Sequence, residues 1–422
     1  MKNSKKVFGL FAFLLVCANV NAGWSVGIPE EYPGIKYDYN NVNVSLPVFN
    51  FTENLTNGGN YIRVGGNSTL DIASDLNINL TSNIPSSSST SILYGNAVGL
   101  GAFGKNNGAP TINAKNVKIK VEAGAADGNN APRGMVMYDG AKYFGENIDI
   151  NLITNSTTEG NDVFGLDFGT NDENLVGNPS NTVMNVKDVN IKIENNQVVI
   201  PAGGEQNTLI GLLQYGEKNQ TSSFTSTGNL NIEIDDKTNK ASYHTSAGII
   251  VAGDSAAKMT LNNSNIKIKS KADNDYYGGA IILGYPDYEA ATTGQGATLE
   301  SKGKMVLDTT EAPDVATLSL HGHGSLFKAD FENSSTEIKS GGTAIRFAGV
   351  SQEFINEGED TKPGRDLTIS LKNAKITTSA TTPDSAPLIV VEDGVKNATF
   401  NLSGSGSEAI AADQNELLLI KG

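Results

Sequence analysis

The chain has 422 residues, with 31 lysines and arginines against 46 aspartates and glutamates, so its formal net charge is −15. An acidic surface repels phosphate groups, and we therefore expect no nucleic-acid partner. The only cysteine, Cys17, lies close to the start of the chain. Disulfides therefore cannot stabilise the rest of the protein, which must depend on burial and hydrogen bonding.

The first 22 residues have the pattern of an export signal rather than of folded structure. Three lysines within the first six residues precede an apolar run at 7–16, and Val20-Asn21-Ala22 places small residues where a signal peptidase cleaves. We predict cleavage after Ala22. No later apolar stretch reaches about 18 residues, so we predict no transmembrane segment in the mature chain.

Residues 23–64 have mixed composition and are interpreted as an N-terminal cap segment, whereas a repeated pattern makes residues 65–422 one continuous body. In each copy an Asn or Asp is followed by apolar residues at alternate positions, usually with Ile in the middle. Successive copies start between 31 and 41 residues apart, a period typical of solenoids. Six clear copies start at Asp75, Asn116, Asn147, Asp188, Asn229 and Asn265, and three weaker ones are centred on Leu307, Ile338 and Ile376.

Alternation of apolar and polar residues indicates a strand with one buried face, because successive side chains point to opposite sides. Two more strands are expected in each period: a short one just before the copy, and a more continuously apolar one in the other half, such as 280–283. Stacking of like strands would bring the central residues of the copies into one buried column. The predicted column consists of Ile78, Ile119, Ile150, Ile191, Ile232, Ile268, Leu307, Ile338 and Ile376.

The Asn or Asp at the head of each copy lies where the chain has to bend between two strands. These residue types tolerate a left-handed backbone, and stacked asparagines can hydrogen-bond along the axis. A bend with the same residue type in every coil resembles the right-handed, single-stranded parallel β-helix, with about nine to ten coils. The alternative, a meander or sandwich of unrelated hairpins, does not require this recurrence. Loop length varies most after the Ile strand, and the face that carries these loops is the expected binding face.

The export signal, the cysteine-free mature chain and the Asn-headed coils resemble the passenger region of bacterial autotransporters, the type V secretion class. The segments LKNAKITTSA and SGGTAIRFAGVSQEFINEG are similar to coils of that family, and the resemblance covers about residue 61 to the end. It implies display at the bacterial cell surface or outer membrane, or secretion, commonly as an adhesin, aggregation factor, protease or toxin carrier. The expected partners are a host or bacterial surface protein or glycan, together with self-association.

Members of that family end in a membrane barrel, whereas this chain stops at Gly422. We therefore expect either a fragment of a longer protein or export by another route. The final apolar strand, 417–420, has nothing after it to cover it. Solenoids need a polar cap on each terminal coil, so we expect an open edge through which the chain associates or frays.

Catalytic motifs are scarce. The run His321-Gly322-His323-Gly324-Ser325, followed by Arg346, superficially resembles an element of polygalacturonase-like glycosidases. Those enzymes need carboxylates on adjacent coils to act as acid and base, and the pair Asp235-Asp236 lies some 85 residues away. We interpret the histidines as surface residues and the protein as a non-enzyme without metal or cofactor. A carbohydrate-active enzyme, either a polysaccharide lyase or a glycosidase, on the same scaffold is the alternative.

Two aromatic clusters are the predicted binding residues. Tyr276 and Tyr277 precede the strand 280–283, and Tyr285 and Tyr288 follow it. Exposed tyrosines offer a large contact area with a polar tip, which suits sugar or protein surfaces. The alternative is that these tyrosines are turn residues stacking on a neighbouring coil.

Overall fold

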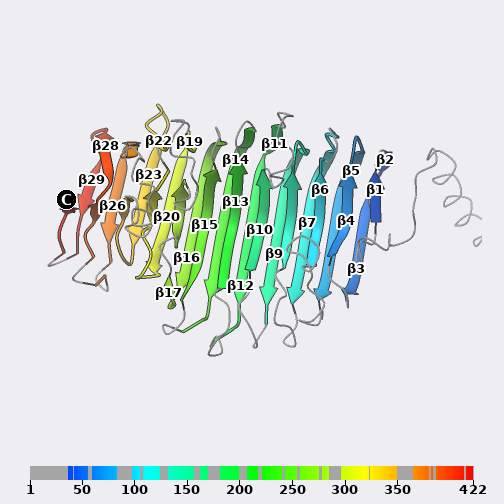
Figure 1. The fold of residues 1–422 in the computed structure, drawn as a ribbon, viewed down its shortest axis with the longest axis horizontal. Coiled ribbons are helices and arrows are strands. Elements are labelled where there is room, and N and C mark those ends of the chain that lie inside the picture. Colours follow the sequence, from blue (N-terminus) through cyan, green and yellow to red (C-terminus); the bar gives the residue numbers. More distant parts are fainter. Residues whose placement is uncertain are drawn as a thin grey trace, which may run out of the picture.

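The fold is a parallel β-helix, in which strands from successive coils stack side by side along one long axis (Figure 1). The computed structural model describes residues 37–421 apart from 41, 56–58, 83–96, 105–107, 124–131, 156–161, 170–180, 199–206, 217–220, 240–242, 254–256, 275–277, 285–295, 323, 349–364, 380–381, 384–385 and 413–414. The predicted export signal lies outside this part of the chain. The described residues form thirty strands and no helix, so none of them forms a helical membrane span.

Sheet A is one continuous stack of parallel strands along the helix axis. Its strands are β1 (Tyr37–Asn40), β4 (Gly59–Gly65), β6 (Ala97–Phe103), β8 (Arg133–Tyr138), β10 (Asp162–Gly169), β13 (Asn207–Gly216), β15 (Tyr243–Gly253), β18 (Gly279–Leu283), β21 (Leu318–Leu320), β24 (Ile345–Phe347), β27 (Ile389–Val391) and β30 (Leu418–Ile420), with the short β17 (Asp273–Asn274) beside β15.

Sheet B is also parallel, and it bends into two halves, which we call faces B1 and B2. Five long strands run through both faces: β5 (Thr69–Ser82), β7 (Thr111–Ala123), β9 (Lys142–Thr154), β14 (Thr221–Asp236) and β16 (Ala257–Ser270). Face B1 adds β2 (Asn43–Leu46), β11 (Asn181–Val186), β19 (Thr298–Ser301), β22 (Leu326–Ala329), β25 (Arg365–Lys372) and β28 (Val395–Ser403). Face B2 adds β3 (Phe49–Leu55), β12 (Asp188–Asn195), β20 (Lys304–Glu311), β23 (Ser335–Ser340), β26 (Ala374–Thr378) and β29 (Glu408–Ile410).

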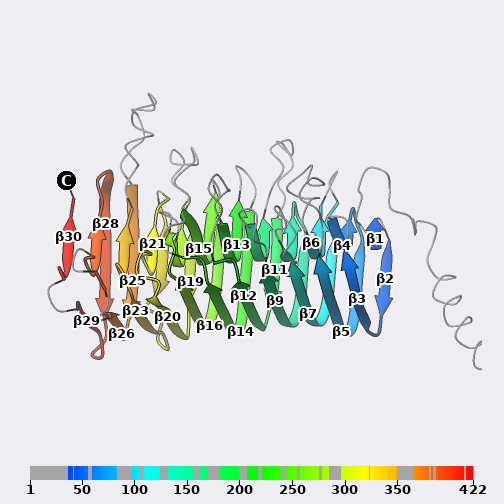
Figure 2. The same cartoon turned by 90° about the horizontal axis from the view of Figure 1, so that it is seen from below.

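Each coil runs through sheet A, face B1 and face B2 in turn, as the three strands per period predicted (Figure 2). Sheet A has twelve strands along its path, and all except β30 are followed by sheet B strands, which gives eleven complete coils in the described part of the chain. This number exceeds the predicted nine to ten coils.

The first coil, β1–β3, lies within the predicted cap segment 23–64 and stacks directly on β4 and β5. Phe51 and Ala409 replace the central Ile in the first and last coils, which hides their pattern in the sequence.

The predicted column of central residues is confirmed at eight of its nine positions. The register pairs Ile78 with Ile119 and continues without a break to Ile232. The next member is Ile266 rather than the predicted Ile268, and it pairs with Leu307. A shift of two residues keeps every side chain on the same face, so alternation alone cannot detect it.

A column of glycines in sheet A faces this column across the core. A Cβ built on any of them would lie within 2.5 Å of Cγ2 of the column isoleucine of the same coil. The pairs are Gly99 with Ile119, Gly134 with Ile150, Gly165 with Ile191, Gly211 with Ile232 and Gly248 with Ile266. The absence of a side chain at these positions therefore makes room for the isoleucine methyl groups.

Heads of the copies form side-chain ladders along the axis, as expected, from Asp75 to Asn147 and from Asp188 to Asn229. The predicted head Asn265 is wrong, because Asn263 pairs with Asn229 in its place. Asn116 Nδ2 donates to Asp75 Oδ1 at 2.7 Å, and Asn147 Nδ2 donates to Asn116 Oδ1 at 2.6 Å. The left-handed backbone expected at these positions is wrong for the heads of all six clear copies. It is present at Asn373, the head of the weaker copy centred on Ile376, whose φ is 50°. A register irregularity, such as that between Ile72 and Asp75, accommodates the bend in the long strands instead.

We expect Asn116→Ala to lower the free energy of unfolding by about 1–3 kcal/mol, because it removes two side-chain hydrogen bonds, one of them to a carboxylate. Asn79→Ala is the matched control, since Asn79 is an exposed strand residue on the same coil stack. Urea denaturation followed by circular dichroism measures both variants. An equal loss for the two would mean that the ladder contributes nothing to stability.

Candidate functional site

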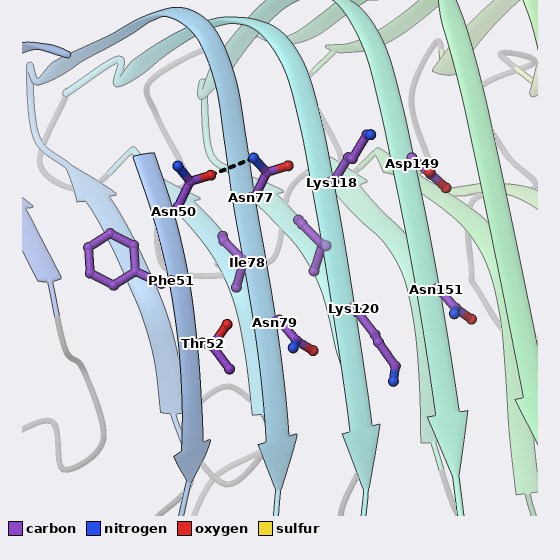
Figure 3. Close-up of a pocket in the computed structure, with 11 residues that line it drawn as sticks. Asn50, Phe51, Thr52, Asn77, Ile78, Asn79, Lys118, Lys120, Asp149 and Asn151 are labelled. Atoms are coloured by element: carbon purple, nitrogen blue, oxygen red, sulfur yellow. Dashed lines mark hydrogen bonds between the residues drawn. The ribbon is translucent and has the colours of Figure 1, made fainter. Parts of the chain in front are cut away.

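A shallow groove of about 430 Å³ lies on face B2 near the N-terminal end of the helix. It crosses β3, β5, β7 and β9, so four successive coils contribute to it (Figure 3). Its lining residues are Asn50, Phe51, Thr52, Asn77, Ile78, Asn79, Lys118, Ile119, Lys120, Asp149 and Asn151.

Strand register arranges the outward side chains of the groove in two rows parallel to the helix axis. The first row is Asn50, Asn77, Lys118 and Asp149, and the second is Thr52, Asn79, Lys120 and Asn151. Neighbours within a row lie about 4.8 Å apart, the spacing of adjacent strands. The side chains of Ile78 and Ile119, between the rows, are buried on the inner side of the sheet.

The centre of the groove is basic, although the protein as a whole is acidic. Lys118 and Lys120 lie on one strand and on the same face, with Asp149 on the next strand. Lys118 is exposed, and Lys120 forms an ion pair with Glu122 at 3.1 Å. At the N-terminal end, Asn77 Nδ2 donates to Asn50 Oδ1 at 2.6 Å (Figure 3).

These side chains suit a polar ligand. Amides present both donors and acceptors, which match the paired hydroxyl groups of a sugar or the backbone of an extended peptide. The exposed ammonium group of Lys118 in the middle adds attraction for a carboxylate or another anion, whereas Lys120 is paired with Glu122. Because every group projects from a strand of a continuous sheet, the arrangement is fixed before a ligand arrives.

A second hollow, of about 540 Å³, lies where face B2 turns toward sheet A, and most of its charges are already paired. Within this hollow, Lys269 lies 2.8 Å from Glu233 and Lys237 lies 2.9 Å from Glu194. The hydrogen bond from each lysine lowers the pKa of the partner carboxyl group. Both lysines that face these carboxylates in the second hollow are therefore already neutralised.

The pair Asp235-Asp236 borders this second hollow, but Asp236 has a structural role. Its side chain is 4% exposed, and its carboxylate accepts hydrogen bonds from Asn195 Nδ2 at 3.0 Å and Ser270 Oγ at 2.8 Å. Oδ1 also accepts from the Thr238 backbone N–H at 3.1 Å. Such a bond to the residue two positions on closes a turn. The same turn recurs at Asn195, Ser270 and Ser340.

The histidine motif begins directly after β21 of sheet A, and the expectation that its histidines are surface residues is wrong for His321. This side chain is fully buried, and its Nε2 lies 2.9 Å from Ser319 Oγ. Arg346 pairs with Ser319 on the neighbouring strand and forms an ion pair with Glu392 at 3.6 Å. The stacking of coils buries the position after β21, which the sequence motif alone does not reveal. His323 lies outside the described residues.

The predicted binding tyrosines, Tyr276, Tyr277, Tyr285 and Tyr288, also lie outside the described residues. The strand that they bracket is described: β18 is fully buried and stacks between β15 and β21. Among the described residues, no group of three or more His, Cys, Asp and Glu side chains is placed to hold a metal ion.

A buried polar cluster in sheet A was not anticipated from the sequence. Arg133 forms an ion pair with Asp167, and the Tyr138 hydroxyl donates to Asp167 Oδ2 at 2.6 Å. The Arg133 guanidinium also lies over the Phe164 ring, 4.3 Å from its centroid. Burial raises the pKa of the Asp167 carboxyl group, and the Arg133 charge opposes that shift. These contacts join β8 to β10, so the cluster links two coils. An arginine within an otherwise apolar strand is the signal that could have revealed it.

Comparisons with protein-family models, with curated proteins and with solved structures found no match to this chain. Its class is therefore defined by its own geometry: a parallel β-helix with a polar, centrally basic groove on its lateral face.

Proposed function

We propose that this protein is an exported β-solenoid of the autotransporter-passenger type that acts in adhesion or aggregation. In this proposal the groove on face B2 binds a surface protein or glycan of a host or bacterial cell. The pattern of an export signal in the first 22 residues supports a location at the cell surface, at the outer membrane or in the medium.

The observation that carries the proposal is the composition of the groove. Its two rows consist of five amide or hydroxyl side chains, two lysines and one aspartate, all on the outer side of a continuous sheet. Open, rigid and polar surfaces of this kind bind extended ligands by many weak contacts, without a deep cavity. A basic centre in a protein of net charge −15 also attracts anionic groups at one defined place.

The alternative is a carbohydrate-active enzyme on the same scaffold. Glycosidases use two carboxyl groups about 5–10 Å apart on either side of the scissile bond. Asp149 is the one carboxylate among the groove-lining residues, and His321 is buried against Ser319. Among the described residues, no second carboxylate lines the groove, which favours the binding function.

The groove is tested by Lys118→Glu, which reverses a central charge. We expect binding to a printed array of neutral and acidic glycans, and to fixed epithelial cells, to weaken about tenfold or more for the best wild-type ligand. Lys115→Glu is the matched control, because Lys115 is an exposed lysine of the same strand but does not line the groove.

Equal binding by the wild type and Lys118→Glu would show that the groove is not the site. If Lys118→Glu and Lys115→Glu lost binding equally, the loss would come from the change in net charge and not from the groove. Analysis of the array sugars after incubation tests the alternative, since cleavage by the wild type would establish an enzyme.

A further inference from the structure

The two rows of the groove continue along face B2, and all but one of their lysines form ion pairs. The paired lysines, each 2.8–3.9 Å from a carboxylate, are Lys120, Lys192, Lys267, Lys339 and Lys375. Lys118 is the exception, since no described residue forms an ion pair or a side-chain hydrogen bond with it. It is exposed in the middle of the groove, so its ammonium group is available to a ligand.

A carboxylate lies beside this lysine in the same row. Asp149 is in register with Lys118 on the neighbouring strand, so their Cα atoms lie about 4.8 Å apart. Asp149 is also exposed, and no described residue pairs with its side chain. The groove therefore presents two opposite charges, one strand apart, that a ligand can reach without breaking an existing pair.

The residue two positions further along each strand points to the same side and supports these charges. On β7, Lys120 adds a second ammonium group, whose pair with Glu122 is exposed and contributes about 1 kcal/mol or less. On β9, Asn151 adds an amide oxygen beside the Asp149 carboxylate (Figure 3). Strand β7 therefore offers cationic donors, and β9 offers an anion and an acceptor.

This arrangement favours a ligand that carries both charges. A neutral ligand lying over Lys118 and Asp149 would remove both from water without giving either an ionic partner. A polyanion would meet the Asp149 carboxylate and the repulsion of a protein of net charge −15. A zwitterionic group has no net charge to be repelled, and it supplies a partner for each side chain.

We propose that the groove binds a phosphoethanolamine group attached to a larger molecule as a phosphodiester. The proposal rests on the groove being the binding site of the proposed function. The phosphate lies over β7 and accepts from Lys118 and Lys120, and the primary ammonium lies over β9 and donates to Asp149 and Asn151. The two-carbon bridge of the ligand holds its charged groups about one strand spacing apart, as the register requires.

The groove also distinguishes ethanolamine from choline. A quaternary ammonium has no N–H to donate, and proteins typically hold it within a cage of aromatic rings. Among the described lining residues, Phe51 is the one aromatic side chain, and it lies on β3, two strands away from β7. Its ring packs against Phe49, with the centroids 4.1 Å apart. We therefore expect the choline analogue to bind less tightly.

Isothermal titration calorimetry of the purified chain tests the ligand. The three probes are glycerophosphoethanolamine, glycerophosphocholine and dimethyl phosphate, which share one phosphodiester charge. We expect the first to bind about tenfold or more tightly than either of the others. Lys118→Gln should weaken the binding of all three. Circular dichroism shows whether each variant keeps its strand content.

Asp149→Asn tests the contact with the ammonium group. It removes the carboxylate with little change in shape, so the preference for glycerophosphoethanolamine over dimethyl phosphate should disappear. Glu146→Gln is the matched control and should keep the preference, because Glu146 is an exposed carboxylate of the same strand that does not line the groove.

Vesicles identify the source of the group. Phosphatidylcholine vesicles and vesicles of phosphatidylcholine with an equal amount of phosphatidylethanolamine are both neutral and differ in the ammonium group. Sedimentation of the protein with the mixed vesicles alone would assign the ligand to a lipid headgroup. Binding of the soluble probe without binding to either vesicle would assign it to a substituent of a surface glycan or protein.

Equal binding of glycerophosphoethanolamine and dimethyl phosphate would overturn the proposal, because the groove would then be a simple anion site. A preference that survives Asp149→Asn would also overturn it. If Lys118→Glu abolished binding to cells while glycerophosphoethanolamine neither bound nor competed, the groove would keep its proposed function and this ligand would be wrong. If the probe bound as expected but Lys118→Glu left binding to cells unchanged, the adhesion proposal would fail and the ligand site would stand.

Discussion

Replacing Ile191 by aspartate is expected to unfold the central coils of the helix. Ile191 is 2% exposed and lies in the column between Ile150 and Ile232, with Gly165 facing it across the core. A carboxylate there has no partner of opposite charge, and an unpaired buried charge costs several kcal/mol. We expect a loss of at least about 3–5 kcal/mol in the free energy of unfolding, measured by urea denaturation. Hydrogen exchange should show that protection is lost first in β9, β12 and β14.

Lys192→Asp is the control for this change. Lys192 is the next residue on the same strand, faces outward and lies 3.9 Å from Glu194 in an exposed ion pair. Loss of such a pair costs about 1 kcal/mol or less, even with a new negative charge nearby. If both aspartate variants lost the same stability, the assignment of inward and outward faces would be wrong.

Gly211→Val is the second change for which we expect a large effect. A Cβ at this position would lie 2.5 Å from Ile232 Cγ2 and 2.7 Å from the Gly248 carbonyl oxygen, before the two methyl groups of valine are added. The isoleucine and the backbone of the next coil would both have to move. Overpacking of this kind typically costs about 1–3 kcal/mol, and we expect about 3 kcal/mol or more because one of the atoms is backbone. Thermal unfolding followed by circular dichroism measures the loss.

Two further variants separate this packing effect from a general loss of glycine. A Cβ on Gly406 would meet nothing within 4 Å, so Gly406→Val should leave the melting temperature nearly unchanged. Combining Gly211→Ala with Ile232→Ala removes the methyl group that the new Cβ would strike. The double variant should therefore lose less stability than the sum of the single changes, by at least about 0.5 kcal/mol. Strict additivity would refute the packing of the glycine column against the isoleucine column.

Local signals in the sequence were sufficient to predict the strands and which face of each strand is buried. Alternation placed Ile78, Ile119 and Ile150 inward because a strand turns its side chains to opposite sides at every residue. The recurring Asn and Asp residues predicted the amide ladder from Asp75 to Asn147, since equivalent positions of stacked coils become neighbours. Their expected left-handed backbone did not follow, because a bend can also be made by a register irregularity within extended strands.

The groove could not be derived in the same way. Its rows join residues from Asn50 to Asn151, and their identities as Asn, Thr, Lys and Asp are those of any outward strand position. Nothing in the local pattern marks these four coils as different from the rest. The sequence instead favoured the tyrosines near β18, which lie outside the described residues.

By itself, the sequence determined the period, the strand faces and the solenoid class, because these depend on residues within one coil and on their recurrence. Only the tertiary structure decided that Ile266 takes the place of Ile268. A shift of two residues keeps the side chains on the same face, so the choice between the two isoleucines depends on pairing with the neighbouring coils. It also decided that His321 is buried and that Arg133 reaches Asp167. Each of these outcomes depends on how one coil lies on another, and the local pattern around a residue does not say which residue of the next coil it will contact.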